Sequence, residues 1–275
     1  MKRTEVRTDS IVAEEEGIVV KTHRGEAAVR ARHEFETLAA LRAAMTAPYE
    51  VPLAIDLDEA AGSLTMERVD GIALDRMIHD AKRHPHAVAR LEMPVRRAGE
   101  WLRAMQEATR VADRSAAQQI LAEQTAAAIA RATAQFPAPL ARRVAARLHE
   151  LRSHVAPHTL SACGHHGDYW PGNVFPGERR TTVIDFEGYR LGLPLEDVAY
   201  FLIQIEILAT RHLRLVAPLR HAFLEGYDGA VDDDALALFT LTRALHLIAR
   251  DAAARHPLVI AIWMRRTLRD IVRRT

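Results

Sequence analysis

Two acidic side chains and one amide, all carrying hard oxygen atoms, lie close together near the middle of the chain. Asp168 and Asn173 fall in one loop-like segment, and Asp185 follows a β-branched and apolar run after a Pro-Gly turn signal. These flanking patterns predict a hairpin whose turn is centred near Arg179. Asn173 lies six residues before that centre and Asp185 six after it, so we expect the two side chains to face each other.

These three residues suit the metal-assisted transfer of a phosphoryl group. Mg²⁺ takes hard oxygen ligands and keeps several waters, so one amide and one carboxylate suffice beside the phosphates of ATP. The reaction also needs a group that orients the attacking hydroxyl and can accept its proton. We therefore predict that Asn173 and Asp185 are metal ligands and that Asp168 is the base. Each residue type is common in loops, and only the combined spacing makes the pattern specific.

The first seventy residues combine strand and helix patterns. Residues 14–17, Glu-Glu-Glu-Gly, predict a hairpin turn. Apolar residues at a spacing of three, such as Leu38 and Leu41, predict a helix over 27–45. The runs that resemble strands are Ile11–Ala13, Ile18–Lys21, Val51–Leu57 and Ser63–Val69.

The pattern changes after Asp70-Gly71. Residues 72–152 are rich in Ala, Leu and Arg and predict helices, a β-rich island follows over 163–187, and helical patterns resume from Leu195. We expect an α+β protein with a small β-rich lobe, residues 1–69, and a large helical lobe, residues 70–275.

The β-rich island resembles the catalytic signature of the aminoglycoside phosphotransferase and choline kinase family, which is related to protein kinases. That signature is H-G-D-x₄-N followed by a strand ending in I-D-[FW]-[ED]. The matching residues here are His166, Asp168, Asn173, Asp185 and Glu187. The resemblance implies a protein-kinase-like fold of two lobes, ATP and Mg²⁺ as cofactors, a small-molecule hydroxyl acceptor, and a structural role for His166.

The N-terminal part contains further residues that the resemblance would use. A kinase-like fold pairs a strand lysine with a glutamate on the next helix, and we expect Lys21 to pair with Glu34 rather than with Glu36. The stretch Leu64–Gly71 resembles the strand and hinge of the family. This implies that adenine binds to backbone groups around Glu67 and Val69.

Two residues of the helical part, Asp197 and Gln106, stand at positions where the family has a typical residue. Asp197 stands where the family has an aspartate that braces the catalytic loop. Gln106 stands where a histidine is common, and we expect no chemical consequence.

The chain departs from the family at its phosphate loop, because no glycine-rich segment precedes the first hairpin. With that hairpin centred between Glu15 and Glu16, Ser10 falls opposite Lys21, and its hydroxyl could meet a phosphate. The departure leaves a nucleotide-binding pseudokinase as an alternative.

The sequence says less about the acceptor. Residues 265–274 include five arginines, which would repel a polycationic aminoglycoside. We therefore expect a sugar, a glycoconjugate or another hydroxylated metabolite, ahead of an amino alcohol or antibiotic. Acidic candidates for contacting the acceptor are Glu206, Glu225, Asp228 and the run Asp232–Asp234, although that run is typical of a helix start.

A metal-dependent hydrolase is a weaker alternative. His154 and His158 have the spacing of two ligands on one helix, but Pro157 lies between them. A net charge of +1, a single cysteine and no apolar stretch long enough to span a membrane predict a cytoplasmic protein that binds no nucleic acid and has no transmembrane segment. The basic segment near the end of the sequence leaves contact with an anionic membrane or an anionic acceptor open.

Overall fold

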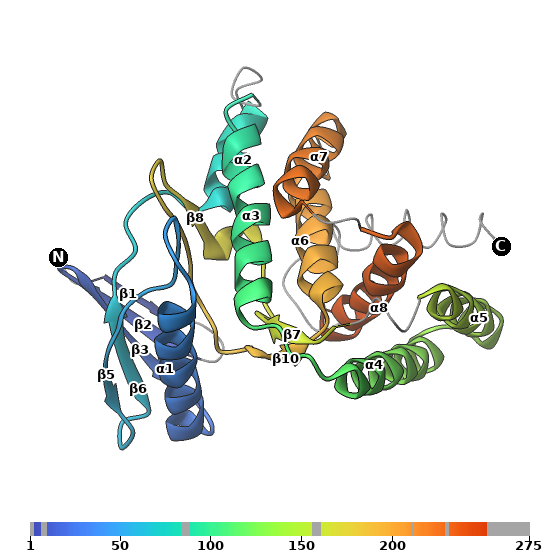
Figure 1. Ribbon diagram of the computed structural model, residues 1–275, viewed down its shortest axis with the longest axis horizontal. Coiled ribbons are helices and arrows are strands. Elements are labelled where there is room, and N and C mark those ends of the chain that lie inside the picture. The colour runs from blue at the N-terminus through green and yellow to red at the C-terminus, as the bar shows by residue number, and fades with distance from the viewer. Residues whose placement is uncertain are drawn as a thin grey trace.

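The computed structural model describes residues 3–6, 10–83, 89–155, 161–210, 212–228 and 231–251. Within these ranges a strand-rich N-terminal part lies beside a larger helical part (Figure 1). The predicted α+β architecture of two unequal lobes is confirmed.

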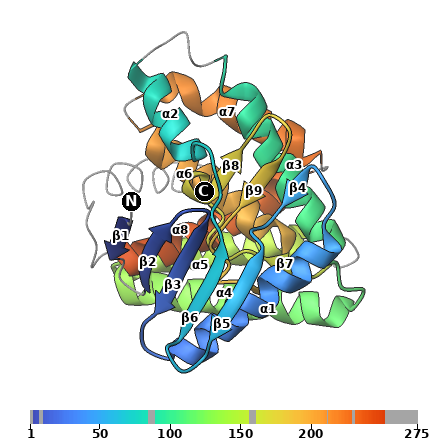
Figure 2. The ribbon, with the colours of Figure 1, turned by 90° about the vertical axis from the view of Figure 1, so that its left-hand side faces the viewer.

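The N-terminal part is built on one antiparallel sheet. Its five strands are β1 (Arg3–Val6), β2 (Ser10–Glu15), β3 (Ile18–His23), β5 (Ala54–Asp58) and β6 (Ser63–Glu67), in the spatial order β1-β2-β3-β6-β5. Helix α1 (Ala27–Ala44) packs against β3, β5 and β6 and lies along one face of the sheet (Figure 2).

The buried face of α1 explains both why the helix forms and where it sits. Ala31, Glu34, Leu38 and Leu41 recur at spacings of three and four residues, and all four are buried, as expected for the inner face of an amphipathic helix. One of these positions is a glutamate. A carboxylate on this face must find partners inside the protein, because a buried charge is costly unless it is paired.

The first hairpin has a different register from the one predicted. Ser10 pairs with His23, and Lys21 pairs with Val12, so the expectation that Ser10 lies opposite Lys21 is wrong. The turn is centred between Glu16 and Gly17 because Gly17 adopts φ +77°. Only glycine adopts positive φ values freely. Gly17 therefore lies in the turn and not in the strand.

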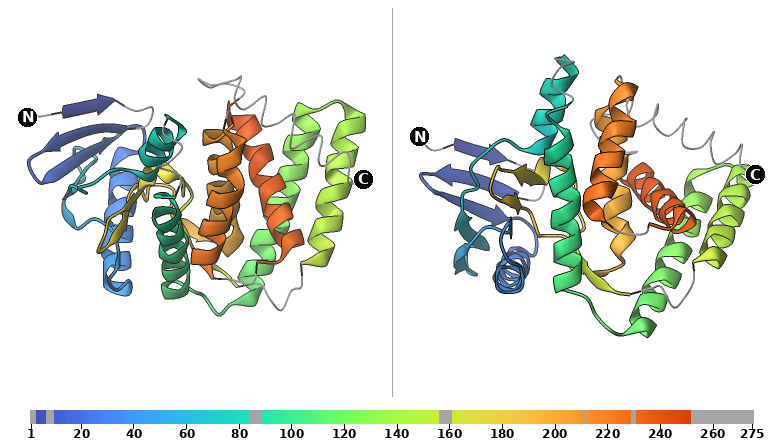
Figure 3. Two further views of the ribbon diagram at one scale, coloured as in Figure 1. Left: turned by 90° about the horizontal axis from the view of Figure 1, so that it is seen from above. Right: turned by 45° about the horizontal axis from the view of Figure 1, so that its top comes forward.

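The C-terminal part is mostly helical, and the helical patterns predicted over residues 72–152 and after Leu195 are confirmed (Figure 3). Its helices are α2 (Leu74–Arg83), α3 (Glu92–Ala108), α4 (Arg114–Gln135), α5 (Ala138–His154), α6 (Pro194–Leu208), α7 (Val216–Tyr227) and α8 (Asp233–Asp251), with short 3₁₀ turns η3 (Pro171–Asn173) and η4 (Leu213–Leu215).

A stack of aromatic rings fills the centre of this part and reaches the predicted catalytic loop. Trp101 stacks on Tyr169 with ring centroids 5.7 Å apart, and Phe201 stacks on Phe223 at 4.2 Å. The Tyr169 hydroxyl donates a hydrogen bond to the carbonyl of Ala98, 2.7 Å away. The residue next to Asp168 is thus anchored in the core.

The β-rich island forms two short sheets. Strand β7 (Cys163–His165) pairs with β10 (Arg190–Gly192), and β8 (Val174–Pro176) pairs with β9 (Thr181–Val183). Strand β9 also pairs in parallel with β4 (Tyr49–Glu50). The β4–β9 pairing connects the segment after α1 to the helical part. The boundary proposed near residue 70 falls between the end of β6 and the start of α2.

The second hairpin is also displaced by one residue. Gly177 donates its N–H to the carbonyl of Arg180, 2.9 Å away, so the turn is centred between Glu178 and Arg179. Ile184, not Asp185, is bound to Asn173, through an N–H···O bond of 3.0 Å. The prediction that Asn173 and Asp185 face each other directly is therefore wrong.

No helix within the described ranges is long and apolar enough to cross a membrane. The apolar stretch and the arginine-rich segment near the end of the sequence lie outside those ranges, as does His158.

Candidate active site

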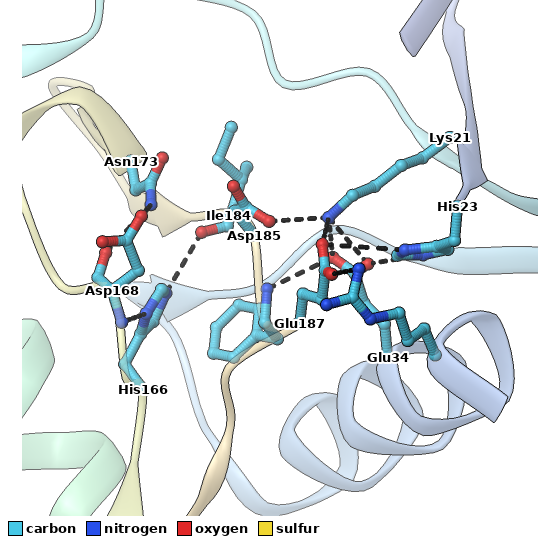
Figure 4. Close-up of polar contacts among 11 residues, drawn as sticks. Lys21, His23, Glu34, His166, Asp168, Asn173, Ile184, Asp185 and Glu187 are labelled. Carbon is cyan, nitrogen blue, oxygen red and sulfur yellow. Dashed lines mark hydrogen bonds and ion pairs between the residues drawn. The ribbon is translucent and has the colours of Figure 1, made fainter. Parts of the chain in front are cut away.

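The ammonium of Lys21 is the centre of a buried ion cluster (Figure 4). Lys21 Nζ lies 2.8 Å from Glu34 Oε2 and 2.6 Å from Asp185 Oδ1. These residues come from β3, from α1 and from the segment that follows β9. The expected Lys21–Glu34 pair is present, whereas Glu36 is exposed.

The cluster holds Lys21 in its charged form. Burial alone lowers the pKa of Lys21, but the carboxylates of Glu34 and Asp185 outweigh burial and raise that pKa above its ordinary value. A fixed positive charge at this point can bind an anionic group such as a phosphate.

Two further residues join the cluster: His23, which the sequence reasoning missed, and Glu187, which it matched to the family signature without giving it a role. His23 Nε2 lies 3.2 Å from Glu34 Oε2, and His23 Nδ1 lies 3.6 Å from Glu187 Oε2. Glu187 also lies 3.4 Å from Lys21 Nζ and 2.9 Å from Arg30 Nη1. His23 follows Lys21 by two residues, so the alternation of a strand places both side chains on one face.

His23, Glu34 and Glu187 resemble a metal site in composition, with ligand atoms within 4.8 Å of one another. However, the ammonium of Lys21 already lies beside both carboxylates. Burial lowers the pKa of His23, but Glu187 and Glu34 outweigh burial and raise it. His23 in turn lowers the pKa of Glu187. We therefore interpret the group as an ion cluster neutralised by Lys21, Arg30 and His23.

The loop that carries Asp168 is held by hydrogen bonds on both sides. Asp168 Oδ1 accepts a bond from the Tyr200 hydroxyl at 2.8 Å. The amide of Asn173 donates to the carbonyl of Asp168 at 2.9 Å and lies 3.5 Å from its Oδ2. Tyr200, on α6, is a contact that the sequence reasoning missed, because 32 residues separate it from Asp168.

His166 connects this loop to the end of β9. Its Nε2 lies 3.1 Å from the carbonyl of Ile184 and must donate to it, and its Nδ1 accepts the N–H of Asp168 at 3.3 Å. A neutral imidazole satisfies both bonds at once. His166 is fully buried, so its position agrees with the structural role that the resemblance implies.

Asp197, near the start of α6, braces the other end of the loop. Its two oxygens accept the N–H groups of His166 at 2.8 Å and Gly167 at 3.2 Å. His165 Nε2 lies 3.1 Å from the same carboxylate. The bracing that the resemblance implied for Asp197 is thus present in the structure. Gln106, in the position where the family often has histidine, donates to the carbonyl of Pro194, 2.9 Å away, at the first residue of α6.

Asp185 reaches Lys21 through an unusual backbone conformation. Its φ is +72°, a region that residues other than glycine enter at a cost on the order of 1–3 kcal/mol. This conformation lies two residues past the end of β9 at Val183, where the alternation of strand side chains no longer holds. In Figure 4, Asp185 is drawn between the Asp168–Asn173 pair and the Lys21 cluster.

A cavity of about 110 Å³ adjoins this cluster between the sheet and β8–β9. Five of the predicted site residues line it: Lys21, Glu34, Glu67, Val69 and Asp185. The N–H groups of Glu67 and Arg68 are already bound to the carbonyls of Leu53 and Gly17. Apolar side chains such as Val12, Val19 and Met66 form the remaining wall, as suits a flat aromatic ring.

The other predicted site residues lie apart from that cavity. Asp168 and Asn173 lie between β7 and β8, and Figure 4 draws them on the other side of Asp185 from Lys21. Ser10 is buried and does not line the cavity, so its contact with a phosphate stays a prediction, without support from its position.

Three of the six acidic candidates for the acceptor are engaged elsewhere. Glu225 lies 3.0 Å from Arg96. Asp232 accepts the N–H of Ala235 at 2.7 Å, which starts α8 as the sequence suggested. Asp234 pairs with His154 at 2.8 Å, and this contact gives His154 a partner other than a metal.

Comparisons with known proteins agree with this arrangement. Residues 7–264 match the phosphotransferase enzyme family, abbreviated APH. The chain belongs to this family. A sequence comparison with curated proteins gives no match.

Several solved structures are similar to this phosphotransferase-family chain over nearly its whole length. A choline/ethanolamine kinase family protein from Mesorhizobium loti is 16% identical, with a TM-score of 0.61 over 99% of this chain and 88% of that one. A glucosamine kinase in complex with glucosamine, ADP and inorganic phosphate is 16% identical, with a TM-score of 0.62 over 99% and 75%. A ternary complex of streptomycin, ATP and APH(2″)-IIa is 12% identical, with a TM-score of 0.60 over 99% and 91%. Identities this low establish the fold alone, and the predicted kinase-like fold is confirmed.

The ion cluster makes a prediction about stability and pH. Because the folded pKa of His23 lies above its ordinary value of 6.5, the folded protein binds this proton more tightly than the unfolded chain does. The contribution of His23 to the free energy of unfolding is then complete below pH 6.5 and is lost as the pH rises through the folded pKa. We expect the stability difference between the wild type and His23→Gln, measured by urea unfolding, to shrink over that range.

His33→Gln is the matched control, because His33 is an exposed histidine of α1. Its stability difference from the wild type should lack this decline. A difference for His23→Gln that is constant or grows with pH would show that His23 is not held as a cation.

Proposed function

We propose that this protein is an ATP-dependent phosphotransferase that moves the γ-phosphate of ATP to a hydroxyl of a small molecule. The observation that carries the proposal is the meeting of Lys21, Glu34 and Asp185, which come from three distant segments, beside a cavity. A cation fixed by carboxylates, next to acids that could hold a metal, is what phosphoryl transfer requires. Membership of the phosphotransferase family supports the same conclusion.

The residues around the cavity have distinct parts in this proposal. Lys21 would bind ATP phosphates, and Glu34 would orient Lys21. Backbone groups around Glu67 and Val69 would bind the adenine. Two structural neighbours are complexes with ADP and with ATP, which supports ATP as the donor.

The donor set also suits Mg²⁺. Asn173 uses its amide N–H on Asp168, and its amide oxygen has no partner among the described residues. Together with the carboxylate of Asp185, it offers the hard oxygens that Mg²⁺ prefers. When bound, the ion would neutralise charge on the phosphate oxygens.

Asp168 is the proposed base. The Tyr200 hydroxyl occupies Oδ1, and a fixed carboxylate of this kind can orient an alcohol O–H and accept its proton. His166 and Asp197 would act by holding the loop, not by touching the substrate.

Two substitutions separate these parts. Asp168→Ala should lower kcat by about 10²- to 10⁴-fold, the usual contribution of a general base, while nucleotide affinity stays near that of the wild type. Asp185→Ala should weaken both turnover and nucleotide affinity, because Asp185 contacts Lys21 and is the proposed metal ligand. Measurements of ADP formation and calorimetric titration with ATP·Mg²⁺ would check both.

Asp80→Ala, at an exposed position of α2, is the control and should change neither quantity. Near-normal turnover in Asp168→Ala would remove Asp168 as the base. Wild-type protein that binds ATP·Mg²⁺ but transfers phosphate to no acceptor would instead support the pseudokinase alternative, which the buried position of Ser10 keeps open.

The acceptor that we propose is a sugar, a glycoconjugate or another hydroxylated metabolite. A polycationic acceptor needs a group of available carboxylates, but Glu225 and Asp234 already have ion-pair partners and Asp232 caps a helix. The arginines at positions 265–274 add positive charge.

A panel of acceptors tests this choice. Sugars, amino alcohols and kanamycin-like aminoglycosides would each be incubated with ATP·Mg²⁺, with ADP formation and product mass as the readouts. We expect phosphorylated product from members of the hydroxylated neutral or acidic class. Strong activity on aminoglycosides with none on sugars would contradict the proposal.

A further inference from the structure

A second cavity lies beside the catalytic loop, between α4 and α8. Its volume is about 270 Å³, more than twice that of the cavity beside Lys21. Figure 1 shows α4 and α8 next to each other, with β7 and β10 at one end of α4. Part of the wall is Gly167, which precedes the proposed base Asp168. The space is large enough for a small organic molecule or several waters.

Three arginines contribute to this wall: Arg131 of α4, Arg190 of β10 and Arg243 of α8. Arg190 Nη2 lies 2.6 Å from Glu196 Oε2, which neutralises it. Within the described ranges, Arg131 and Arg243 have no carboxylate partner. Asp197, the other acid nearby, is occupied by His165 and two backbone N–H groups. Arg131 and Arg243 therefore contribute two positive charges to the cavity wall that form no ion pair with a carboxylate in the part of the chain that the structure describes.

The wall also holds buried polar atoms without hydrogen-bond partners. Burial lowers the pKa of His165, and its Nε2 lies 3.1 Å from Asp197 Oδ1. Nε2 of a neutral ring then carries the proton, so Nδ1 is an acceptor. His165 Nδ1 and Arg243 Nε are both buried, and neither has a hydrogen-bond partner in the described part of the protein. Such atoms are nearly always satisfied by protein, water or ligand.

We propose that this cavity binds a small hydroxylated anion, of the chemical class of sugar phosphates and sugar acids. The anionic group would pair with Arg131 and Arg243, and hydroxyls would supply hydrogen bonds to groups such as His165. A neutral or cationic ligand would leave both guanidinium groups unpaired. The residues that line this cavity do not belong to the Lys21 cluster, so the proposal does not depend on phosphoryl transfer.

The ligand would contact the residue that supports the catalytic loop. Arg243 Nη2 donates to the carbonyl of Gly167 at 3.0 Å, and its guanidinium lies 3.8 Å from the centre of the Tyr200 ring. The hydroxyl of Tyr200 in turn donates to Asp168. Binding at Arg243 therefore acts on two contacts that position the proposed base.

Calorimetric titration of the full chain with two anions tests the proposal: glucose 6-phosphate and gluconate, with glucose as the neutral match. We expect glucose 6-phosphate and gluconate to bind and glucose to bind more weakly than either. Arg131→Gln should weaken both anions about tenfold or more, because charge-assisted hydrogen bonds are among the strong ones. Arg131→Lys keeps the charge and should lose less.

Arg114→Gln is the matched control, since Arg114 is exposed at the start of the same helix. It should bind both anions as the wild type does. Arg131 has no ion pair to lose in the described ranges, and thermal unfolding of each variant without ligand would verify that it is folded.

Three results would overturn the proposal. The first is that glucose binds as tightly as glucose 6-phosphate. The second is that Arg131→Gln binds both anions with wild-type affinity. The third is that neither anion binds, which would mean that the cavity holds only water. An anion that binds beside Lys21 instead would give the second result. Any of these, with ATP·Mg²⁺ turnover intact, would leave the proposed phosphotransferase activity untouched.

Discussion

The structure around the site depends on one buried ammonium, that of Lys21. Glu34 and Asp185 approach it from different segments, with carboxylate oxygens 2.8 Å and 2.6 Å from its Nζ. Removing one partner from a buried ion pair typically costs about 3–5 kcal/mol, because the remaining charge stays buried and unpaired. This penalty fixes the sheet, α1 and the end of β9 in one arrangement, and that arrangement defines the cavity proposed for the nucleotide.

A second set of contacts positions the catalytic loop independently of Lys21. Asp197 binds its backbone from α6, His166 ties it to Ile184, and Tyr169 anchors it in the aromatic core. Asp197, His166 and Tyr169 are buried, and none of them lines the cavity beside Lys21. Asp185 lies between the two sets, and its left-handed backbone conformation is a local cost that the surrounding contacts offset.

Much of this site could be predicted from the sequence, because its strongest signals are local. The spacing of Asp168, Asn173 and Asp185 indicated the chemistry, and the helical spacing of Ala31, Glu34, Leu38 and Leu41 accounts for the burial of Glu34. Both hairpin registers were wrong by a small shift. Which residues form the turn depends on local backbone conformation, such as the positive φ of Gly17. The pattern of apolar residues in the strands does not predict that conformation.

Other parts of the site lie beyond sequence patterns. Tyr200 and Arg243 reach the catalytic loop from helices that only the tertiary fold brings near it, and no spacing rule links them to Asp168 or Gly167. His23 did leave a signal, since it shares a strand face with Lys21. A histidine in a strand is more often a surface or core residue than part of an ion cluster, so that signal alone would not have been specific.

A double-mutant cycle on Lys21 and Glu34 tests the central claim most directly. The free energy of unfolding would be measured for Lys21→Met, Glu34→Gln and the double variant, with Lys21→Met/Glu36→Gln as the control pair. We predict that the double variant loses much less stability than the sum of the single variants, with a coupling of about 2 kcal/mol. The control pair should be additive. Additive losses for Lys21 and Glu34, within about 0.5 kcal/mol, would contradict the view that this buried pair organises the site.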